Sequence, residues 1–358
     1  MKRTIRALVA TVLVVAVSAC GGGNNGNGQG DQGGGNGQGG QGDGNGQGGQ
    51  GDRSAATCEA PSDLARRSDV PIGVLMPSGS LQRQSYTSAA EIAAGGLNAV
   101  SLGFEFYYTA SGELAYDFDG NADDNAKERW KNNLRCNVIE AKQAGLVVAV
   151  WGQFIEAGRR GEPGTMPADV QVRVLESAVG LMPEVAKLLE ELQVEYWSPA
   201  SELDKFAGTS GHNAYFARMV EAGRPHFSGT MYVQPNILQR DGFAAQQLEP
   251  DLGGVDALGI SWISYECEEG KLPPGVTLGW ADFVVQAAAA QGITRVFISE
   301  VGSTQAADES KRPCLEKLID YWDGATNGVF VLDMPSDQPG GAVVKGNWQE
   351  DVLRSLRN

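Results

Sequence analysis

A repeated alternation of short apolar runs and longer amphipathic stretches constrains this chain most, from Pro71 to its last residue. Each run is rich in β-branched residues and is followed by a turn and then by apolar residues at helical spacing. The predicted strands are 71–76, 98–104, 145–152, 194–199, 229–234, 257–262, 294–299 and 328–333. Alternating strands and helices build a parallel sheet, and eight units within about 290 residues fit a closed sheet better than an open one. The pattern therefore predicts an α/β fold of the (β/α)8 TIM-barrel type.

Helix start and stop signals support this alternation. Asp123 or Asp124 is placed to cap a helix that ends before Gly145, and Pro167 opens a helical region to residue 192 that we expect to break near Gly180. Further helices are expected at 213–222, 280–290, 310–322 and 347–356. The turn after the first predicted strand, 76–80, lacks the Gly-x-Gly-x-x-Gly pattern, which disfavours a dinucleotide-binding fold.

The first residues have the layout of an export signal. Three basic residues within 1–6 precede an apolar run at 7–17 and a small-residue site before Cys20. A helix of eleven residues at about 1.5 Å each is too short to span a hydrocarbon core of roughly 30 Å. A cysteine at this place resembles the bacterial lipobox. The resemblance implies that 1–19 is a lipoprotein signal peptide, that Cys20 is lipidated, and that the protein is exported and lipid-anchored at the bacterial cell envelope. An ordinary cleaved signal is the alternative.

Residues 20–54 consist almost entirely of Gly, Asn, Gln and Asp after Cys20. Without apolar side chains to offset the entropy of ordering, we expect a disordered tether with a reach of roughly 30 Å. The folded domain is then 55–358, which is long enough for one large core.

Charge and cysteine content limit the partners. A net charge of −16 and two histidines disfavour nucleic acid and a histidine-built metal site, and we expect no cofactor and a monomer. Besides Cys20, four cysteines remain, and in an exported domain they predict two disulfides. Three pairings are possible; we favour Cys58–Cys136 and Cys267–Cys314, with free buried thiols as the alternative.

Two glutamates follow predicted strands at the end of the barrel where reactive groups gather. Glu202 follows the fourth predicted strand in Trp-Ser-Pro-Ala-Ser-Glu, and Glu300 follows the seventh in Ser-Glu-Val-Gly. Glutamates at these two places are the signature of the clan A retaining glycoside hydrolases, and the chain resembles that clan over roughly 71–358. The two motifs look most like its mannanase and galactanase families.

The resemblance implies that Glu202 is the acid/base, that Glu300 is the nucleophile, and that Tyr265 hydrogen-bonds the nucleophile. Retaining cleavage needs one carboxylate to attack the anomeric carbon and one carboxylic acid to protonate the leaving oxygen, about 5–5.5 Å apart. The chain departs from the clan at two positions. Ser201 stands where the clan has Asn, and Glu105 stands where it often has Arg.

Other polar and aromatic residues near the strand ends are candidate sugar contacts. Trp151 and Trp262 offer flat faces that suit pyranose rings, with burial in the core as the alternative for each. Asn236, Gln153 and Glu105 offer hydrogen-bonding groups for sugar hydroxyls.

An acidic loop has the spacing of a calcium-binding EF-hand loop. Its candidate ligands are Asp117, Asp119, Asn121, Asp123 and Glu128. Because Ala122 stands where the tight turn needs Gly, a solvated loop that caps the next helix is the alternative.

The sequence thus predicts a retaining glycoside hydrolase that acts on a β-linked polysaccharide or oligosaccharide. A catalytically inactive, glycan-binding barrel is one alternative, motivated by Ser201 and Glu105. A two-lobed solute-binding lipoprotein is another, although the chain shows no sign of crossing between lobes.

Overall fold

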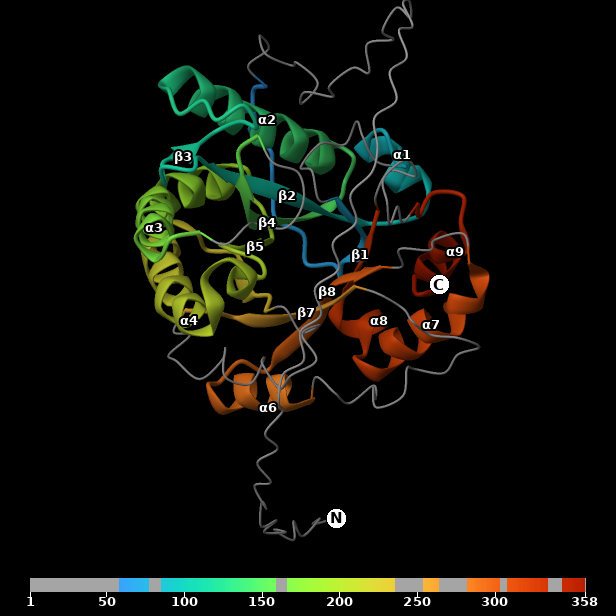
Figure 1. The fold of residues 1–358 in the computed structure, drawn as a ribbon. Coiled ribbons are helices and arrows are strands. Elements are labelled where there is room, and N and C mark those ends of the chain that lie inside the picture. Colours follow the sequence, from blue (N-terminus) through green and yellow to red (C-terminus); the bar gives the residue numbers. More distant parts are fainter. Residues whose placement is uncertain are drawn as a thin grey trace, which may run out of the picture. The chain divides into compact units, whose positions relative to one another are not determined.

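Eight parallel strands close into a barrel (Figure 1). The computed structural model describes residues 58–76, 85–158, 166–235, 254–263, 282–302, 308–333 and 343–357. The barrel strands are β1 (Ile72–Met76), β2 (Ala99–Tyr108), β4 (Val147–Glu156), β5 (Tyr196–Ser198), β6 (Thr230–Val233), β7 (Ala257–Ile263), β8 (Arg295–Gly302) and β9 (Val329–Leu332). Since β1 pairs with both β2 and β9, the sheet closes on itself. The predicted TIM barrel is confirmed, and a two-lobed architecture is not what the chain adopts. The expected signal peptide 1–19 and the expected tether 20–54, which includes Cys20, lie outside the described residues.

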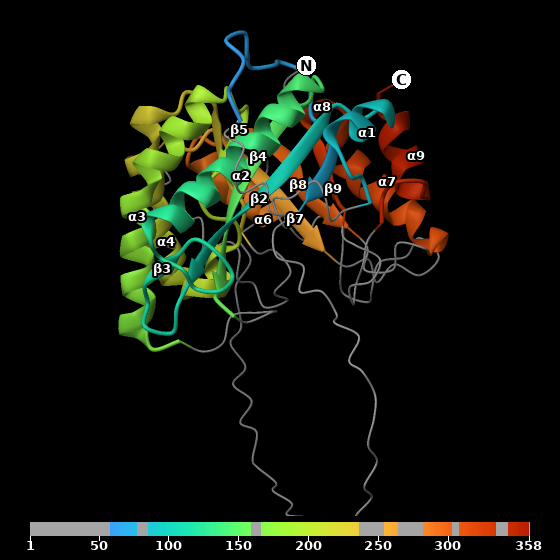
Figure 2. The same ribbon diagram turned by 90° about the horizontal axis from the view of Figure 1, so that it is seen from above.

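Two strands are longer than the sequence predicted. β2 and β4 pair residue by residue to Tyr108 and Glu156, and the two-residue strand β3 (Leu114–Ala115) adds to β2 in the antiparallel direction (Figure 2). Continued pairing extends both strands, because each backbone group finds its ladder partner, and Phe106, Tyr108 and Phe154 of the extensions are buried in the outer core. The expected ends at 104 and 152 were therefore too early.

Helices cover the outside of the barrel (Figure 1). They are α1 (Ala89–Ala94), α2 (Asp124–Gln143), α3 (Ala168–Glu191), α4 (Leu203–Gly223), α6 (Asp282–Ala290), α7 (Arg312–Tyr321), α8 (Gly324–Asn327) and α9 (Trp348–Ser355), with single 3-10 turns η2 (Arg224–His226) and η4 (Glu309–Lys311). The Asp123 side chain caps α2 by accepting from the Ala126 amide at 2.7 Å, as predicted. None of the helices in the described part of the chain is long and apolar enough to cross a membrane.

Packing overrides weak helix propensity in two places. The break expected near Gly180 was wrong: α3 runs through it, because its buried face, including Leu181 and Met182, packs onto the barrel. Helix α4 begins ten residues before the predicted start at 213, since Leu203 and Phe206 are buried despite the glycines that follow them.

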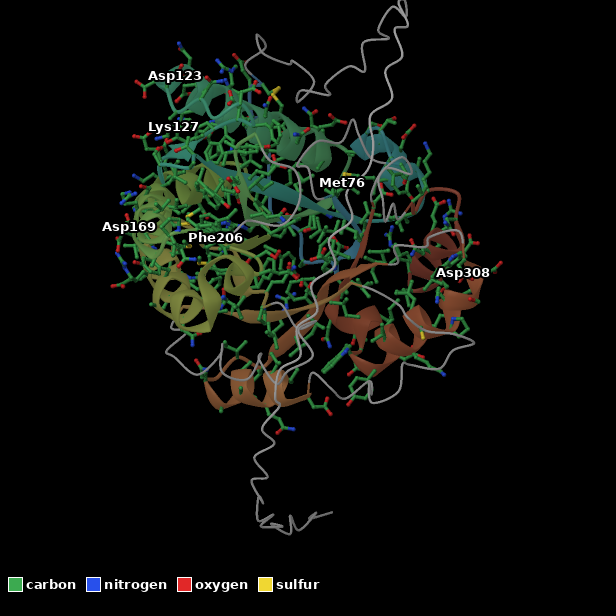
Figure 3. All side chains as sticks on the ribbon, in the orientation of Figure 1. Met76, Asp123, Lys127, Asp169, Phe206 and Asp308 are labelled. Atoms are coloured by element: carbon green, nitrogen blue, oxygen red, sulfur yellow. A yellow bond between two sulfur atoms is a disulfide. The ribbon has the colours of Figure 1, made fainter. Side chains whose placement is uncertain are left out.

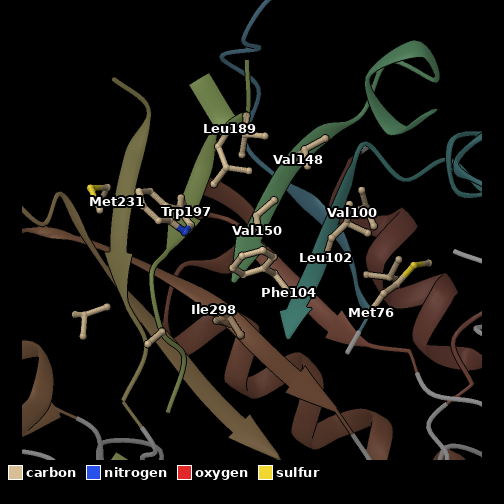
Figure 4. Packing of buried hydrophobic residues seen from close by; sticks show 14 of the residues in the cluster. Met76, Val100, Leu102, Phe104, Val148, Val150, Leu189, Trp197, Met231 and Ile298 are labelled. Atoms are coloured by element: carbon tan, nitrogen blue, oxygen red, sulfur yellow. The ribbon is translucent and has the colours of Figure 1, made fainter. Parts of the chain in front are cut away.

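The apolar core has two layers. The inner cluster fills the barrel with Leu75, Ala99, Val147, Ala149, Trp151, Tyr196, Tyr232, Ala257, Phe297, Phe330 and Leu332. The outer cluster lies between the strands and the helices and includes Val148, Val150, Leu189 and Trp197 (Figure 4). Charged side chains such as Asp123 and Asp169 lie outside both layers (Figure 3).

The segment before β1 binds to residues at the end of the barrel where the strands begin. The Cys58–Cys136 disulfide ties it to α2, as predicted. Arg66 donates to the Val194 carbonyl at 2.7 Å, and the Arg67 amide donates to the buried Glu195 carboxylate at 2.8 Å. Cys314 is also disulfide-bonded, and Cys267, its expected partner, lies outside the described residues.

Removing the Cys58–Cys136 disulfide should lower the stability of the folded domain. The bond closes a loop with a sequence separation of 78, and its loss increases the entropy of the unfolded chain. We expect Cys58→Ala/Cys136→Ala to lower the free energy of unfolding by about 2–4 kcal/mol in urea titrations. A midpoint equal to that of the wild type would show that the bond does not stabilise the domain.

Buried His212 should make the protein sensitive to mild acid. Both ring nitrogens lack a hydrogen-bond partner in the described part of the chain, and burial lowers the pKa of His212 from 6.5 to about 4. The unfolded chain binds a proton at His212 more readily than the folded chain does. Protonation therefore costs the folded state no stability above about pH 6.5, and it lowers the free energy of unfolding progressively as the pH falls towards 4. In unfolding titrations at pH 7 and at pH 4, we expect the free energy of unfolding to fall between the two pH values by about 2–3 kcal/mol less in His212→Leu than in the wild type. Parallel pH dependence in variant and wild type would contradict this assignment.

Candidate active site

The Ser261 hydroxyl joins the two predicted catalytic glutamates. Ser261 lies on β7, and its Oγ is 3.2 Å from Glu202 Oε1 and 3.2 Å from Glu300 Oε2. Those two carboxyl oxygens are consequently at most about 6.4 Å apart, a spacing that allows both to act on one bond. The fold thus brings together two side chains that are far apart along the chain.

An extra residue in β8 directs Glu300 towards Ser261. Ile260 pairs with Ile298 but the next β7 residue, Ser261, pairs with Glu300, so β8 contains a bulge at this point. Strict alternation from the inward-facing Phe297 would turn Glu300 to the outside. The bulge shifts the alternation by one residue, so that Glu300 faces Ser261 while Val301 packs in the outer cluster.

Glu300 is held by neutral hydrogen-bond donors. Its side chain is buried, and Oε2 accepts from Gln234 Nε2 at 2.8 Å as well as from Ser261. Tyr232 lies nearby on β6: burial, and then the charge of Glu300, raise the pKa of this phenol, so it stays protonated. Two donors on one oxygen suit the ionised form of Glu300.

Glu202 takes a backbone conformation that is unfavourable for a residue with a side chain. It has φ 48° and ψ 36°, in the left-handed region, directly before α4. The Glu202 amide donates to the Gln234 carbonyl at 2.8 Å, and the Ser201 amide donates to the Gly152 carbonyl at 2.7 Å. These two bonds hold the turn that presents the Glu202 side chain to Ser261, and strain of this kind clusters at functional sites.

A second polar group lies on β2 and β4. Tyr107 donates its hydroxyl to Glu105 Oε2 at 2.5 Å, and Glu105 stands next to Gln153 in the strand register. The phenol thus satisfies one oxygen of Glu105, a further carboxylate at the barrel mouth. Trp151 is only 4% exposed and belongs to the inner cluster, so its ring fills the barrel rather than offering an open stacking face.

The sequence prediction missed Gln234 as a partner of Glu300, because Gln234 is the last residue of the predicted strand 229–234 and only Asn236, after the strand, was a candidate. Ser261 lies within the predicted strand 257–262 and was not singled out either. Asn236, Tyr265 and the side chain of Trp262 lie outside the described residues. Inward alternation from Tyr232 was the signal that could have identified Gln234.

Four of the five candidate calcium ligands are engaged in contacts with other residues, and the fifth, Asp119, is exposed. Asp117 accepts from the Asn121 amide at 3.0 Å and Asn121 Nδ2 at 2.8 Å, Asp123 caps α2, and Glu128 pairs with Lys131. No group of three or more acidic, His or Cys side chains in the described ranges is arranged to hold a metal ion. Helix capping and turn formation account for this loop without a cation.

Comparisons with known proteins give structural matches. No protein-family model matches the chain, and no curated protein does. A solved GH113 β-1,4-mannanase complex is similar at 14% identity and a TM-score of 0.55, over 80% of this chain and 98% of that one. The GH113 β-mannanase from Alicyclobacillus acidocaldarius matches at 15% identity and 0.54, over 82% and 98% of the two chains. A glycoside hydrolase family 5 enzyme from Prevotella bryantii matches at 15% identity and 0.54, over 85% and 100%. These likenesses confirm the TIM-barrel fold over nearly the whole length of each neighbour.

The left-handed backbone of Glu202 can be tested by comparing two substitutions. Glu202→Ala and Glu202→Gly both remove the carboxyl group, but only glycine adopts this conformation without strain. We expect the glycine variant to unfold with a free energy about 1 kcal/mol higher than that of the alanine variant. A less stable glycine variant would show that the turn is not strained.

Proposed function

We propose that this protein is a retaining glycoside hydrolase that acts on a β-linked polysaccharide or oligosaccharide, with Glu300 as nucleophile and Glu202 as acid/base. The observation that carries the proposal is the contact of both carboxyl groups with one Ser261 hydroxyl at the mouth of the barrel. The bound on their separation, about 6.4 Å, accommodates the spacing of about 5–5.5 Å that retaining cleavage needs.

The surroundings of each glutamate suit its proposed role. Glu300 is buried beside two neutral donors, which favours a fixed, ionised carboxylate that can attack the anomeric carbon. Glu202 is more exposed than Glu300 and lies in a strained turn before α4. Its exposure suits a group that exchanges protons first with the leaving oxygen and then with water.

Two steps would follow from this arrangement. Glu300 bonds to the anomeric carbon as Glu202 gives its proton to the departing glycosidic oxygen, and a glycosyl ester forms. Glu202, now a carboxylate, takes a proton from a water molecule whose oxygen attacks the same carbon and releases Glu300. Two displacements on opposite faces retain the configuration of the sugar.

Comparisons support the reaction class without fixing the substrate. The matched structures are described as a β-1,4-mannanase, a β-mannanase and a glycoside hydrolase family 5 enzyme. Export and lipid attachment through Cys20 would place such an activity at the cell envelope, where polymeric substrates are met.

A catalytically inactive barrel that binds glycan is the second candidate. It is favoured by Glu105, a further carboxylate in the barrel mouth, held by the Tyr107 hydroxyl. An inactive barrel would bind an oligosaccharide in calorimetry and release no reducing ends from it.

Substitution of the two glutamates separates these possibilities. We expect Glu300→Ala and Glu202→Ala each to lower kcat on an activated aryl glycoside or a soluble polysaccharide by about 10²-fold or more. Added azide should restore turnover by different routes. In Glu300→Ala it replaces the nucleophile and gives a glycosyl azide of inverted configuration, and in Glu202→Ala it attacks the glycosyl ester and gives one of retained configuration. Glu221→Gln, at an exposed position of α4, is the matched control and should behave as wild type. Equal activity in wild type and Glu300→Ala would end the proposal.

A further inference from the structure

Ser261 is placed to control which of the two glutamates carries a proton. Its hydroxyl lies between Glu202 and Glu300 at 3.2 Å from each, and Ser261 is the direct register partner of Glu300 in the barrel. A hydroxyl has one hydrogen atom, so it can make a straight hydrogen bond to only one carboxylate at a time. Both contacts become full hydrogen bonds when one carboxyl group is protonated and donates to Oγ while the hydroxyl donates to the other.

We propose that Ser261 is a positioning residue that stabilises the singly protonated state of the Glu202–Glu300 pair and reverses its hydrogen bond between the two half-reactions. The inference rests on the proposed function, since it assigns Ser261 a part in the same reaction. It goes beyond that function by naming a third side chain that acts on both glutamates.

Gln234 determines which of the two carboxyl groups accepts the hydrogen bond of Ser261 before the reaction begins. Its Nε2 can only donate, and it donates to Glu300 Oε2, the oxygen that also faces Ser261. In the proposed arrangement Glu300 is therefore the ionised partner, and Glu202 holds the proton that is shared by the pair. The chain of bonds runs from the Glu202 carboxylic acid to Ser261 Oγ and from the Ser261 hydroxyl to Glu300.

During the proposed reaction, the negative charge moves between Glu300 and Glu202, and the hydrogen bond of the Ser261 hydroxyl changes its acceptor with it. When Glu202 gives its proton to the leaving oxygen and Glu300 becomes an ester, the negative charge passes from Glu300 to Glu202. Rotation of the Ser261 hydroxyl then lets it donate to Glu202. When Glu202 takes a proton from the attacking water and the ester bond to Glu300 breaks, the hydroxyl turns back. No proton leaves Ser261, so it acts as a donor that follows the charge.

Other titratable groups line the described barrel mouth and interior. They are Tyr232 on β6, Glu105 with Tyr107 on β2, Tyr196 on β5 with Arg295 beside it on β8, and Asp333 after β9, which accepts from the Ser85 amide at 3.0 Å. Their charges act on the pair in wild type and in Ser261 variants alike, so a comparison between variants isolates the contribution of the hydroxyl.

The pH dependence of kcat/KM tests the proposal. A stabilised singly protonated state lowers the acidic pKa of the pair and raises the basic one, which widens the active range. We expect Ser261→Ala to narrow this range by about one pH unit or more, with the acid limb moving up and the base limb moving down. Ser261→Thr keeps the hydroxyl and should keep the width. An unchanged width in Ser261→Ala would overturn the proposal.

Ser299→Ala is the matched control. Ser299 is a buried serine of β8 next to Glu300, and its hydroxyl donates to the Ile260 carbonyl at 3.2 Å. The substitution removes the same group from the same pair of strands, so a general loss of packing should appear in it equally. We expect its pH range to match that of the wild type, and a range narrowed as much as in Ser261→Ala would refute the proposal.

A measurement without turnover separates this inference from the proposed function. Titration of the glutamate carboxyl carbons by NMR, assigned with Glu202→Gln and Glu300→Gln, reports the two proton-binding steps directly. We expect the steps to lie closer together in Ser261→Ala than in wild type, whether or not any sugar is cleaved. Equal spacing would refute the role of Ser261 even in an active enzyme. A changed spacing without glycosidase activity would instead refute the proposed function.

Discussion

The pairing of β1 with both β2 and β9 is the constraint on which the rest of the structure depends. It removes both edges from the eight-stranded sheet and leaves an inner face too narrow for anything but its own side chains. Aromatic residues such as Tyr232 and Phe297 fill that interior, while helices cover the outside. Closure also fixes how far β5 lies from β8, and so it sets the distance between the two glutamates.

Two local irregularities then aim those glutamates at one point. The bulge in β8 turns Glu300 inward, and the left-handed backbone at Glu202 turns that side chain towards Ser261. Neither irregularity improves the local structure, since a bulge interrupts the ladder and a left-handed glutamate is strained. Close packing around them leaves little freedom. A Cβ at Gly259 would lie 2.6 Å from Ser299 Oγ, and one at Gly152 would lie 2.3 Å from the Pro199 carbonyl oxygen.

The described part of the site holds its nucleophile candidate with neutral groups. Gln234 and Ser261 donate to Glu300, and Tyr107 donates to a further carboxylate, Glu105. A neutral donor stabilises a charge less strongly than a guanidinium would, but it can reorient as that charge moves. Two neutral donors thus hold Glu300 in place in a chain that has Glu105, rather than arginine, in its second strand.

The sequence by itself determined the order and number of the strands, the cap of α2 by Asp123 and the candidate pair Glu202 and Glu300. These features depend on local patterns: apolar periodicity, turn residues and motifs that follow a strand. Only the tertiary structure decided that β2 and β4 continue to Tyr108 and Glu156, that α3 runs through Gly180, and that Gln234 and Ser261 meet Glu300. The bulge in β8 is the clearest example of a feature that the sequence does not predict, because strict alternation along β8 would have placed Glu300 outside the barrel. Strand pairing and packing are set by residues from distant parts of the chain, and no local window of sequence contains them.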